Sequence, residues 1–447
     1  MRRFANSSDG RRQTTLVLGD QIIVSGANFA AGLILARFLG PDGFGQFVLA
    51  YNIIFFVSGI QIALIISPMM VIGPTLTKER RREYDAAVLL QQLFCCVVFG
   101  AVILAIGHIA SHFVPQWGLG SLLWALIFGT FGFICQDFSR RYLFVHNSAG
   151  AALANDLITH GLKVTLLTGF GMTLALNANS AFWVVALASA VGALLAVILF
   201  GGRHSLTWPG YAVLSRVNYQ HWNFGKWLLA NSIVYWSSSQ LVIYMAGAVI
   251  STAAVGNISA ALNVVGAANI LFLAMENLVP SRAARMYALR GQDGLNRYLR
   301  RVVVRGGIGT LSIVAVAGYW SEFWLELFYG PAYKGAGWIV IWSGVFCFLG
   351  FFQRPLSVGL RVLGNTRAIF FASLVGAFVA ISVSYPAIRW AGVVGVMFVL
   401  CLVQMAVMIT MWLCYKRTTG AQQSERRSDI GTTSTALVSP TNMKEMP

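Results

Sequence analysis

Twelve apolar runs, each at least 18 residues long and nearly free of charge, most constrain what this chain can fold into. A membrane-spanning helix needs about 20 mostly apolar residues, so at this length a buried helix of a soluble protein is the less common alternative. Open strands are excluded, because lipid cannot satisfy an exposed sheet edge. We therefore predict an all-α integral membrane protein with twelve transmembrane helices. The runs cover residues 14–38, 44–73, 86–109, 119–138, 151–176, 180–201, 224–249, 253–279, 302–320, 336–353, 366–386 and 390–414.

The composition supports this fold class. Hydrophobic residues make up 57% of the 447 positions and charged residues only 11%, whereas soluble domains carry about a quarter charged residues. These values exclude a soluble globular enzyme. All six cysteines lie inside or at the ends of apolar runs, so we expect no disulfide framework. The net charge of +17 does not predict a nucleic-acid partner, because the basic residues are distributed by loop and not gathered on one face.

The distribution of Lys and Arg among the loops predicts the orientation. Positive residues stay on the cytoplasmic side of a membrane. Alternate connections, together with both termini, hold 28 of the 32 basic residues, while the other connections hold only Lys334 and Arg389. We expect both termini in the cytoplasm and the basic loops against the anionic inner leaflet of the lipid bilayer.

A weak internal repeat supports two halves. A shift of 211 residues aligns residues 39–46 with 250–257 and pairs Asn52 with Asn263. The shift maps spans six apart, and an even number of spans preserves orientation, so we predict two six-helix lobes related as parallel repeats. The tail is rich in Ser, Thr, Gln and charge, which predicts disorder. The predicted organisation is a cytoplasmic N-terminus 1–13, an N-lobe 14–201, a cytoplasmic linker 202–223, a C-lobe 224–414 and a disordered cytoplasmic tail 415–447.

The chain lacks the features of a membrane enzyme. Its external connections are short, the longest covering about residues 321–335, and no phosphate-binding glycine loop, zinc-protease pattern or Cys/His cluster with metal spacing occurs. We therefore expect a transporter with no catalytic residues, no metal site and no cofactor.

One cation falls in the middle of an apolar run. Asp156, His160 and Lys163 follow i, i+4, i+7 spacing and share one face of the helix over 151–176. A lysine at the centre of a span costs about 2.5–3.5 kcal/mol, so Lys163 should face the protein interior or a water-filled cavity. A structural ion pair is its alternative interpretation.

The first run, 14–38, carries a similar polar stripe that includes Asn28, with Asp20 toward the cytoplasm and Arg37 at the external end. Such stripes are more often interhelical hydrogen bonds, Arg37 can reach the external headgroups, and Asp20 and Asp156 can be solvated end residues. The candidate substrate-binding residues are Lys163, Arg37, His160 and Asn28, and the candidate ion-coupling residues are Asp20 and Asp156.

Three short segments carry a family resemblance. The sequence LARFLGPDGFG at 35–45 resembles the helix 1 to helix 2 signature of Wzx-type polysaccharide and O-antigen flippases of the multidrug/oligosaccharidyl-lipid/polysaccharide exporter superfamily. The Val255-Gly256 pair that opens helix 8 and the LFYGPAY sequence at 327–333 fit the same pattern. The resemblance implies a bacterial inner-membrane transporter that moves an undecaprenyl-diphosphate-linked oligosaccharide by alternating access for cell-surface polysaccharide synthesis, with a polysaccharide polymerase as a candidate partner.

Two other function classes are open. A cation-coupled multidrug exporter of the same superfamily would share the twelve helices, but a cleft for cationic drugs should carry an acid at its midplane. An integral membrane enzyme of envelope assembly is disfavoured by the short external loops. A central cation suits a diphosphate, so Lys163 is predicted to supply the main positive charge, with Arg37 as an external second contact. His160 would add charge when protonated.

Overall fold

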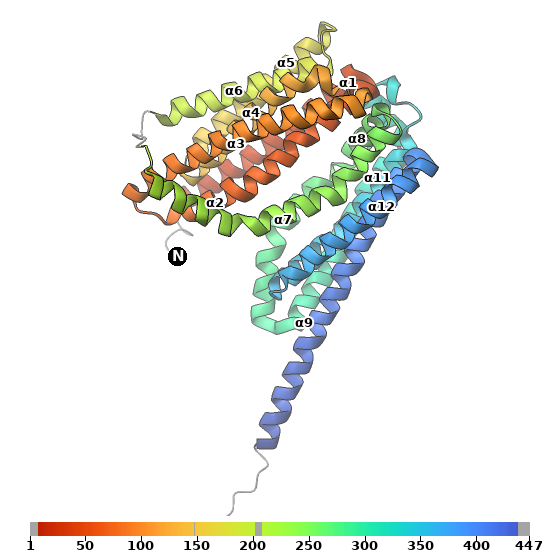
Figure 1. The fold of residues 1–447 in the computed structure, drawn as a ribbon. Coiled ribbons are helices and arrows are strands. Elements are labelled where there is room, and N and C mark those ends of the chain that lie inside the picture. Colours follow the sequence, from red (N-terminus) through yellow and green to blue (C-terminus); the bar gives the residue numbers. More distant parts are fainter. Residues whose placement is uncertain (1–7, 147, 202–207, 437–447) are drawn as a thin grey trace, which may run out of the picture.

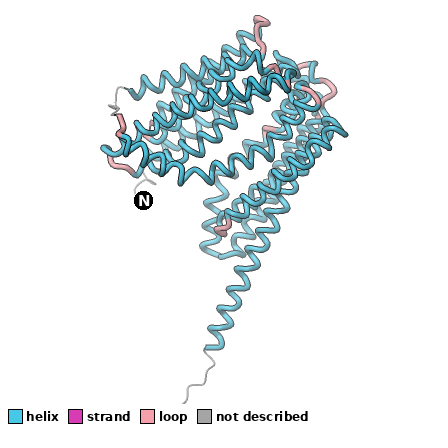
Figure 2. The backbone as a smooth tube through the Cα atoms, in the orientation of Figure 1, coloured by secondary structure: helices cyan, strands magenta, loops and turns pink. Residues whose placement is uncertain are grey.

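The computed structural model describes residues 8–146, 148–201 and 208–436, and these ranges contain helices and short connections without a β-strand (Figures 1 and 2). Helices suit lipid because they satisfy the backbone hydrogen bonds within one segment. The first half comprises α1 Ser8–Gln61, the π-helix η1 Ile62–Ile66, α2 Ser67–Ile72, η2 Gly73–Thr75, α3 Lys78–Phe113, η3 Pro115–Trp117, α4 Leu119–Val145, α5 Ala149–Met172 and α6 Ala178–Gly201. The second half comprises α7 Tyr211–Val249, α8 Thr252–Val265, α9 Ala268–Tyr319, α10 Ser321–Tyr329, η4 Pro331–Tyr333, α11 Gly337–Val362 and α12 Thr366–Ala436.

The predicted runs lie in helical backbone, apart from a few terminal residues and an interruption at residues 266–267. By length and composition, seven helices of the described ranges are apolar enough to cross a membrane. Three of the long helices, α1, α9 and α12, each join two predicted segments across a kink at Gly40, Gly291 or Gly392, where φ is 68°, 60° and 56°. This left-handed conformation favours glycine, so each kink lies where the sequence permits it. The prediction of an all-α membrane fold is confirmed.

Small residues let the helices of the N-lobe approach closely. Helices in lipid gain little from burying apolar surface against one another, so tight van der Waals packing matters more. A Cβ added to Gly132 of α4 would lie 3.0 Å from the carbonyl oxygen of Ala186 on α6. A Cβ on Gly192 of α6 would overlap the hydroxyl of Thr159 on α5. These contacts join α4, α5 and α6 into one packed unit.

The two lobes diverge from a shared end. In Figure 1, α1–α6 extend to the left and α9–α12 extend downward, and they converge at the upper right, where α1 packs against α8. Helix α7 connects the lobes: its first part packs on α3, where the Tyr84 hydroxyl and His221 Nε2 lie 2.8 Å apart, and its later part packs on α12. The two-lobe prediction agrees with this arrangement.

The predicted linker 202–223 includes helical backbone, and its assignment as a cytoplasmic linker stays a prediction. Residues 202–207 lie outside the described ranges, whereas residues 211–223 form the start of α7. This stretch contains no Gly or Pro, and His221 anchors it to α3, so nothing interrupts the helix.

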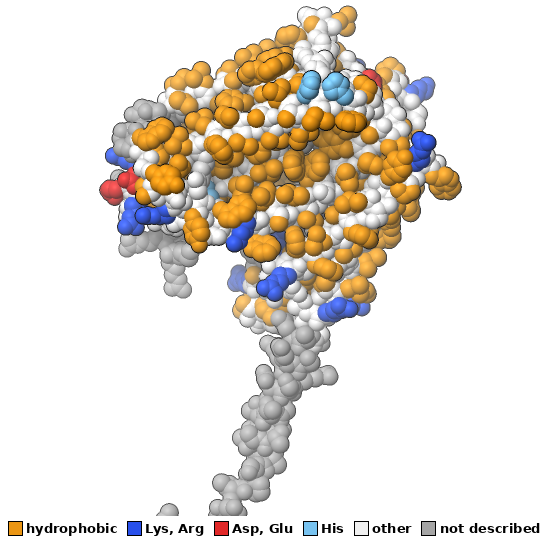
Figure 3. All heavy atoms as spheres, in the orientation of Figure 1, with side chains coloured by type: hydrophobic (Ala, Val, Ile, Leu, Met, Phe, Trp, Pro, Cys, Tyr) orange, Lys and Arg blue, Asp and Glu red, His pale blue; other side chains and the backbone are white. Residues whose placement is uncertain are grey.

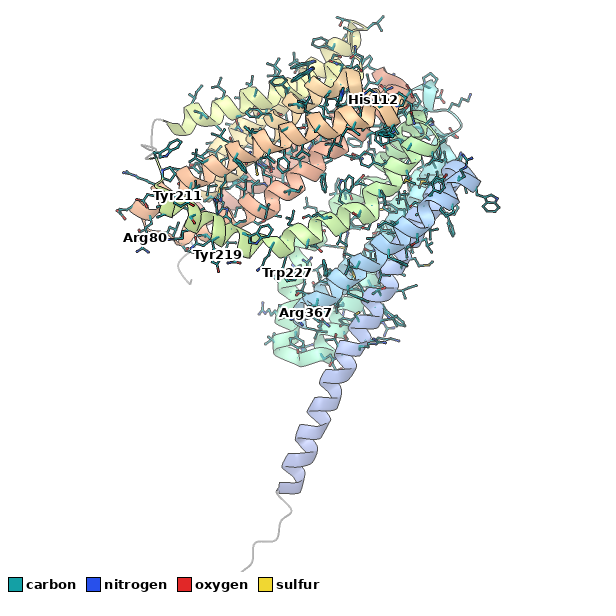
Figure 4. All side chains as sticks on the ribbon, viewed as in Figure 1. Arg80, His112, Tyr211, Tyr219, Trp227 and Arg367 are labelled. Carbon is teal, nitrogen blue, oxygen red and sulfur yellow. The ribbon has the colours of Figure 1, made fainter. Side chains whose placement is uncertain are left out.

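The molecular surface matches a lipid environment. Apolar side chains cover much of the face in Figure 3, and on α3 the exposed fractions of Phe94 and Val97 reach 70% and 71%. Three aromatic side chains at and near the start of α7 are also exposed, those of Trp208, Tyr211 and Trp222. In Figure 4 the labelled Tyr211 lies at the same end of the molecule as Arg80. The chain is a multi-pass membrane protein.

The C-terminal segment is more helical than the sequence predicts. Helix α12 continues to Ala436 and projects away from the lobes (Figure 1), although residues 415–447 were expected to be disordered. Extending an existing helix needs no new nucleus, and residues 415–436 contain no proline. Residues 437–447 lie outside the described ranges.

Candidate functional site

A cavity of about 1040 Å³ lies between the lobes, at the upper end of the usual size for a binding pocket. Its walls come from α1, α5 and α6 on one side and from the later part of α7 with α8, α9, α11 and α12 on the other. The charged side chains of its described lining are Lys163, Glu276, Arg354 and Arg361. With three cations and one acid, this lining is net positive.

Lys163 is held by a neutral partner. Its Nζ donates a hydrogen bond of 2.7 Å to Asn28 Oδ1 of α1, and the lysine is only 8% exposed. None of the ion pairs among the described residues includes Lys163. The structure therefore brings together two predicted site residues, Lys163 and Asn28, and leaves the lysine charge without a protein counter-ion in the described ranges.

The two candidate ion-coupling residues meet around an arginine that the sequence analysis did not single out. Arg140 of α4 lies 2.6 Å from Asp20 Oδ2 through Nη2 and 2.5 Å from Asp156 Oδ2 through Nε. Gln136 donates a hydrogen bond of 2.8 Å to Asp156. Asp20 and Asp156 are fully buried, and neither belongs to the cavity lining. The cluster joins α1, α4 and α5, and its role in ion coupling stays a prediction.

Two other predicted residues lie away from the cavity in this conformation. Arg37 is exposed and donates through Nη1 to the carbonyl oxygen of Leu327, 3.2 Å away, near the end where the lobes converge. His160 is buried in the N-lobe and is not part of the cavity lining. A contact of either residue with substrate stays a prediction.

Two cavity cations were missed because their segment was assigned to a loop. The apolar run ends at residue 353, yet α11 continues to Val362 and includes Arg354 and Arg361. Residues seven apart lie on one helix face, so both side chains line the cavity. That spacing, on a continuation of the helix, was the available sequence signal.

Arg354 is the more structured of these two cations. Its Nη1 donates to Glu276 Oε1 of α9, and its guanidinium lies 4.2 Å from the ring centre of Phe272. Neighbouring Gln353 donates to the carbonyl oxygen of Gln404 on α12 at 2.9 Å. The C-lobe wall is thus a polar surface connecting α9, α11 and α12.

A break in a predicted span also faces the cavity. The run 253–279 was expected to form one helix, but α8 ends at Val265 and α9 begins at Ala268. Asn263 and Asn269 flank the break, and both line the cavity. Discontinuous helices are common at transporter binding sites. The glycine at the break, Gly266, was too weak a signal to predict the interruption.

Where the lobes converge, α1 and α8 meet in a clasp formed by Pro41, Gly45, Thr252 and Gly256. A Cβ on Gly45 would overlap the carbonyl oxygen of Thr252, and a Cβ on Gly256 would overlap that of Pro41. The Thr252 hydroxyl also donates to the Asp42 carboxylate. Pro41 and Thr252 are 211 residues apart, as are Gly45 and Gly256, so the shift exchanges the two contacts. Such reciprocity is typical of a two-fold axis and supports the parallel repeats.

Comparisons with known proteins identify the fold. The MatE family profile matches residues 228–386, and no curated protein matches the chain. An inward-facing multidrug resistance MATE family transporter of the MOP superfamily gives a TM-score of 0.72 at 16% identity, covering 92% of this chain and 99% of its own. An outward-facing structure of the same description gives 0.63 at 17% identity, covering 92% and 95%.

A third solved structure has the same fold. It is a MOP superfamily transporter from Pyrococcus furiosus, with a TM-score of 0.63 at 16% identity, covering 94% of this chain and 98% of its own. The fold of this chain is that of MATE transporters, and the family match and the fold are those of membrane transporters, not of enzymes.

Proposed function

We propose that this protein is a flippase that moves a polyprenyl-diphosphate-linked oligosaccharide across a bacterial inner membrane by alternating access. The observation that carries the proposal is the net positive lining of the cavity between the lobes, with Lys163 on one side and Arg354 and Arg361 on the other. A cation in a low-dielectric cavity attracts an anionic headgroup strongly. The lipid tail would remain in the bilayer while the headgroup and its sugars cross in the cavity.

The conformation supports loading from the cytoplasmic leaflet. The lobes converge at the clasp and diverge toward the chain ends (Figure 1). The excess of Lys and Arg favours the cytoplasm for that open end. The higher TM-score with an inward-facing relative than with an outward-facing one agrees with this orientation.

A cation-coupled multidrug exporter is the competing function, since the two MATE structures described above are called multidrug resistance transporters. The cavity lining disfavours it for this chain, because Glu276 is its one described acid and is paired with Arg354. For the Pyrococcus furiosus transporter, a binding pocket of reverse polarity suggests a different function, so this fold accommodates more than one pocket charge.

Reconstitution separates the two functions. Purified protein in liposomes is supplied with a fluorescent polyprenyl-diphosphate sugar on one leaflet, and a membrane-impermeant quencher reports its appearance on the other. In parallel, the same liposomes are tested for uptake of a cationic dye. We expect movement of the lipid-linked sugar above that of empty liposomes and no dye uptake. Dye uptake without sugar movement would overturn the proposal in favour of the multidrug exporter.

A further inference from the structure

We propose that Glu276 competes with the substrate anion for Arg354. Without substrate, the Glu276 carboxylate forms an ion pair with Arg354, and a diphosphate that enters the cavity displaces this carboxylate. The inference rests on the proposed function and adds a second recognition point in the C-lobe, opposite Lys163. Removing the charge of Glu276 should strengthen anion binding, and removing the charge of Arg354 should weaken it. An ion pair with only a structural role would not give these opposite effects.

The geometry of Arg354 leaves part of its guanidinium unused. Glu276 Oε1 accepts a hydrogen bond from Nη1, whereas Nε is buried and has no hydrogen-bond partner among the described residues. A guanidinium presents its donors as a planar fork that suits two oxygens of a phosphate group. A diphosphate has enough oxygens to accept from more than one nitrogen of the guanidinium, which the single-point contact with Glu276 does not.

The contact with Glu276 is also easy to replace. The Glu276 side chain is 57% exposed and that of Arg354 is 32% exposed, and both residues line the cavity. Ion pairs this accessible to solvent contribute little to folding stability. Displacing Glu276 would therefore cost little, and its carboxylate would be solvated in the open cavity.

The guanidinium is held in place independently of Glu276. It lies 4.2 Å from the ring centre of Phe272, which is 5% exposed and stacks on Phe351 with a centroid separation of 6.3 Å. This cation–π contact keeps Arg354 facing the cavity when the acid leaves. A preorganised cation binds an incoming anion without first losing side-chain entropy.

The test measures binding of inorganic pyrophosphate to the purified full chain in nanodiscs at low ionic strength. Glu276→Gln removes the competing charge at nearly constant volume, so the dissociation constant should fall about two- to fivefold, the range of an exposed ion pair. Arg354→Gln should raise it about tenfold or more, as expected for a lost charged hydrogen bond. In the Arg354→Gln background, Glu276→Gln should produce no further tightening.

Matched controls separate this competition from a general charge effect. Glu326→Gln removes an exposed acid that does not line the cavity, and Arg389→Gln removes an exposed cation likewise outside it. Neither should change the affinity appreciably. Pyrophosphate binding by Glu276→Gln that is weaker than or equal to that of the wild type would overturn the inference. So would a Glu326→Gln variant that binds pyrophosphate as tightly as Glu276→Gln, or the same gain in affinity when Glu276→Gln is added to Arg354→Gln.

Two further measurements keep the inference distinct from the proposed function. A short-chain prenyl diphosphate should show the same order of affinities among the variants, which extends the result from the free anion to a lipid headgroup. Absence of saturable pyrophosphate binding in every variant would overturn the inference. Movement of lipid-linked sugar in liposomes would still decide the proposed function on its own.

Discussion

Lys163 is a buried cation of the N-lobe and Arg140 a largely buried one, yet their partners differ in charge. Arg140 is paired with two carboxylates, those of Asp20 and Asp156. Lys163 contacts the neutral amide of Asn28 and lines the cavity. The charge of Arg140 is therefore compensated within the protein, whereas the charge of Lys163 is available to a substrate. Substitutions of Lys163 should therefore impair transport, whereas substitutions of Arg140 should impair stability.

For Lys163, we expect charge to determine transport. Lys163→Ala should abolish or severely reduce glycan export at normal protein abundance, because the N-lobe then offers no cation to the diphosphate. Lys163→Arg should retain part of the activity, and Lys163→Glu should be worse than Ala because it repels the headgroup. Export in cells, normalised to protein abundance, measures the series. Full activity of the Ala variant would leave Lys163 as a structural residue.

For Arg140, we expect charge to determine stability. Its side chain is 15% exposed and bridges two buried carboxylates, so Arg140→Gln should destabilise the fold by about 3–5 kcal/mol. Adding Asp156→Asn should restore part of this loss by removing one of the uncompensated charges. Thermal unfolding of purified protein in detergent measures both variants. A melting temperature unchanged by Arg140→Gln would show that the cluster contributes nothing to stability.

At the scale of elements, we expect the clasp between α1 and α8 to keep its end of the cavity closed. Gly45→Ala should act as a wedge, because its Cβ would overlap the carbonyl oxygen of Thr252. Overpacking of this kind costs about 1–3 kcal/mol, which would shift the equilibrium toward forms with α1 and α8 apart. A cysteine at the cavity-lining Ser259, in a background without native thiols, should then react faster with an impermeant maleimide added at the clasp side.

The control for this wedge lies on the same helix. A Cβ on Gly26 of α1 would meet nothing within 4 Å, so Gly26→Ala should leave the labelling rate at Ser259 unchanged. Gly256→Ala should reproduce the effect of Gly45→Ala, since the repeat exchanges the two contacts. Equal labelling rates in the wild type and both clasp variants would mean that the clasp does not limit access.

The extension of α12 beyond the lobes yields a separate prediction. Residues after Thr419 extend away from the helical body (Figure 1), so deleting them should leave transport intact once expression is matched. Export by cells carrying the truncated chain measures this. Complete loss of export at equal abundance would show that the segment recruits or docks a partner.

The sequence predicts the transmembrane segments well because lipid imposes length and apolarity on each of them. It does not predict where those helices continue past the lipid boundary. Arg354 and Arg361 were assigned to a loop for that reason, although α11 carries both into the cavity. The break after Val265 was missed because Gly266 is too weak a local signal to predict an interruption of an apolar run.

The same limit applies to the site. Lys163 was found because a cation in the middle of an apolar run is costly and therefore informative. Its partner Asn28 is 135 residues away, and the packing of α1 against α5 determines their contact. Arg140 gave no such signal, because it lies near the end of its helix, where arginines are common. Arg140 is distinguished by its pairing with the buried carboxylates of Asp20 and Asp156, which only the three-dimensional structure shows.

At the scale of the whole molecule, the excess of basic residues on one side predicts a single orientation. The termini and alternate connections that hold 28 of the 32 Lys and Arg residues should lie in the cytoplasm, so the clasp end should lie outside the cell. The structure places two of the expected external positions together, since the Asn179 side chain donates a hydrogen bond to the backbone of Ser121.

Cysteine labelling tests this orientation with an outer and an inner set of positions. In a background without native thiols, single cysteines in the outer set should react with an impermeant maleimide added to intact cells, and those in the inner set should react only after permeabilisation. The outer set is Ser121, Asn179 and Lys334, and the inner set is Arg81, Arg216 and Arg297. The reverse pattern would invert the topology and place the open cavity toward the outside, which would also remove the case for loading from the cytoplasmic leaflet.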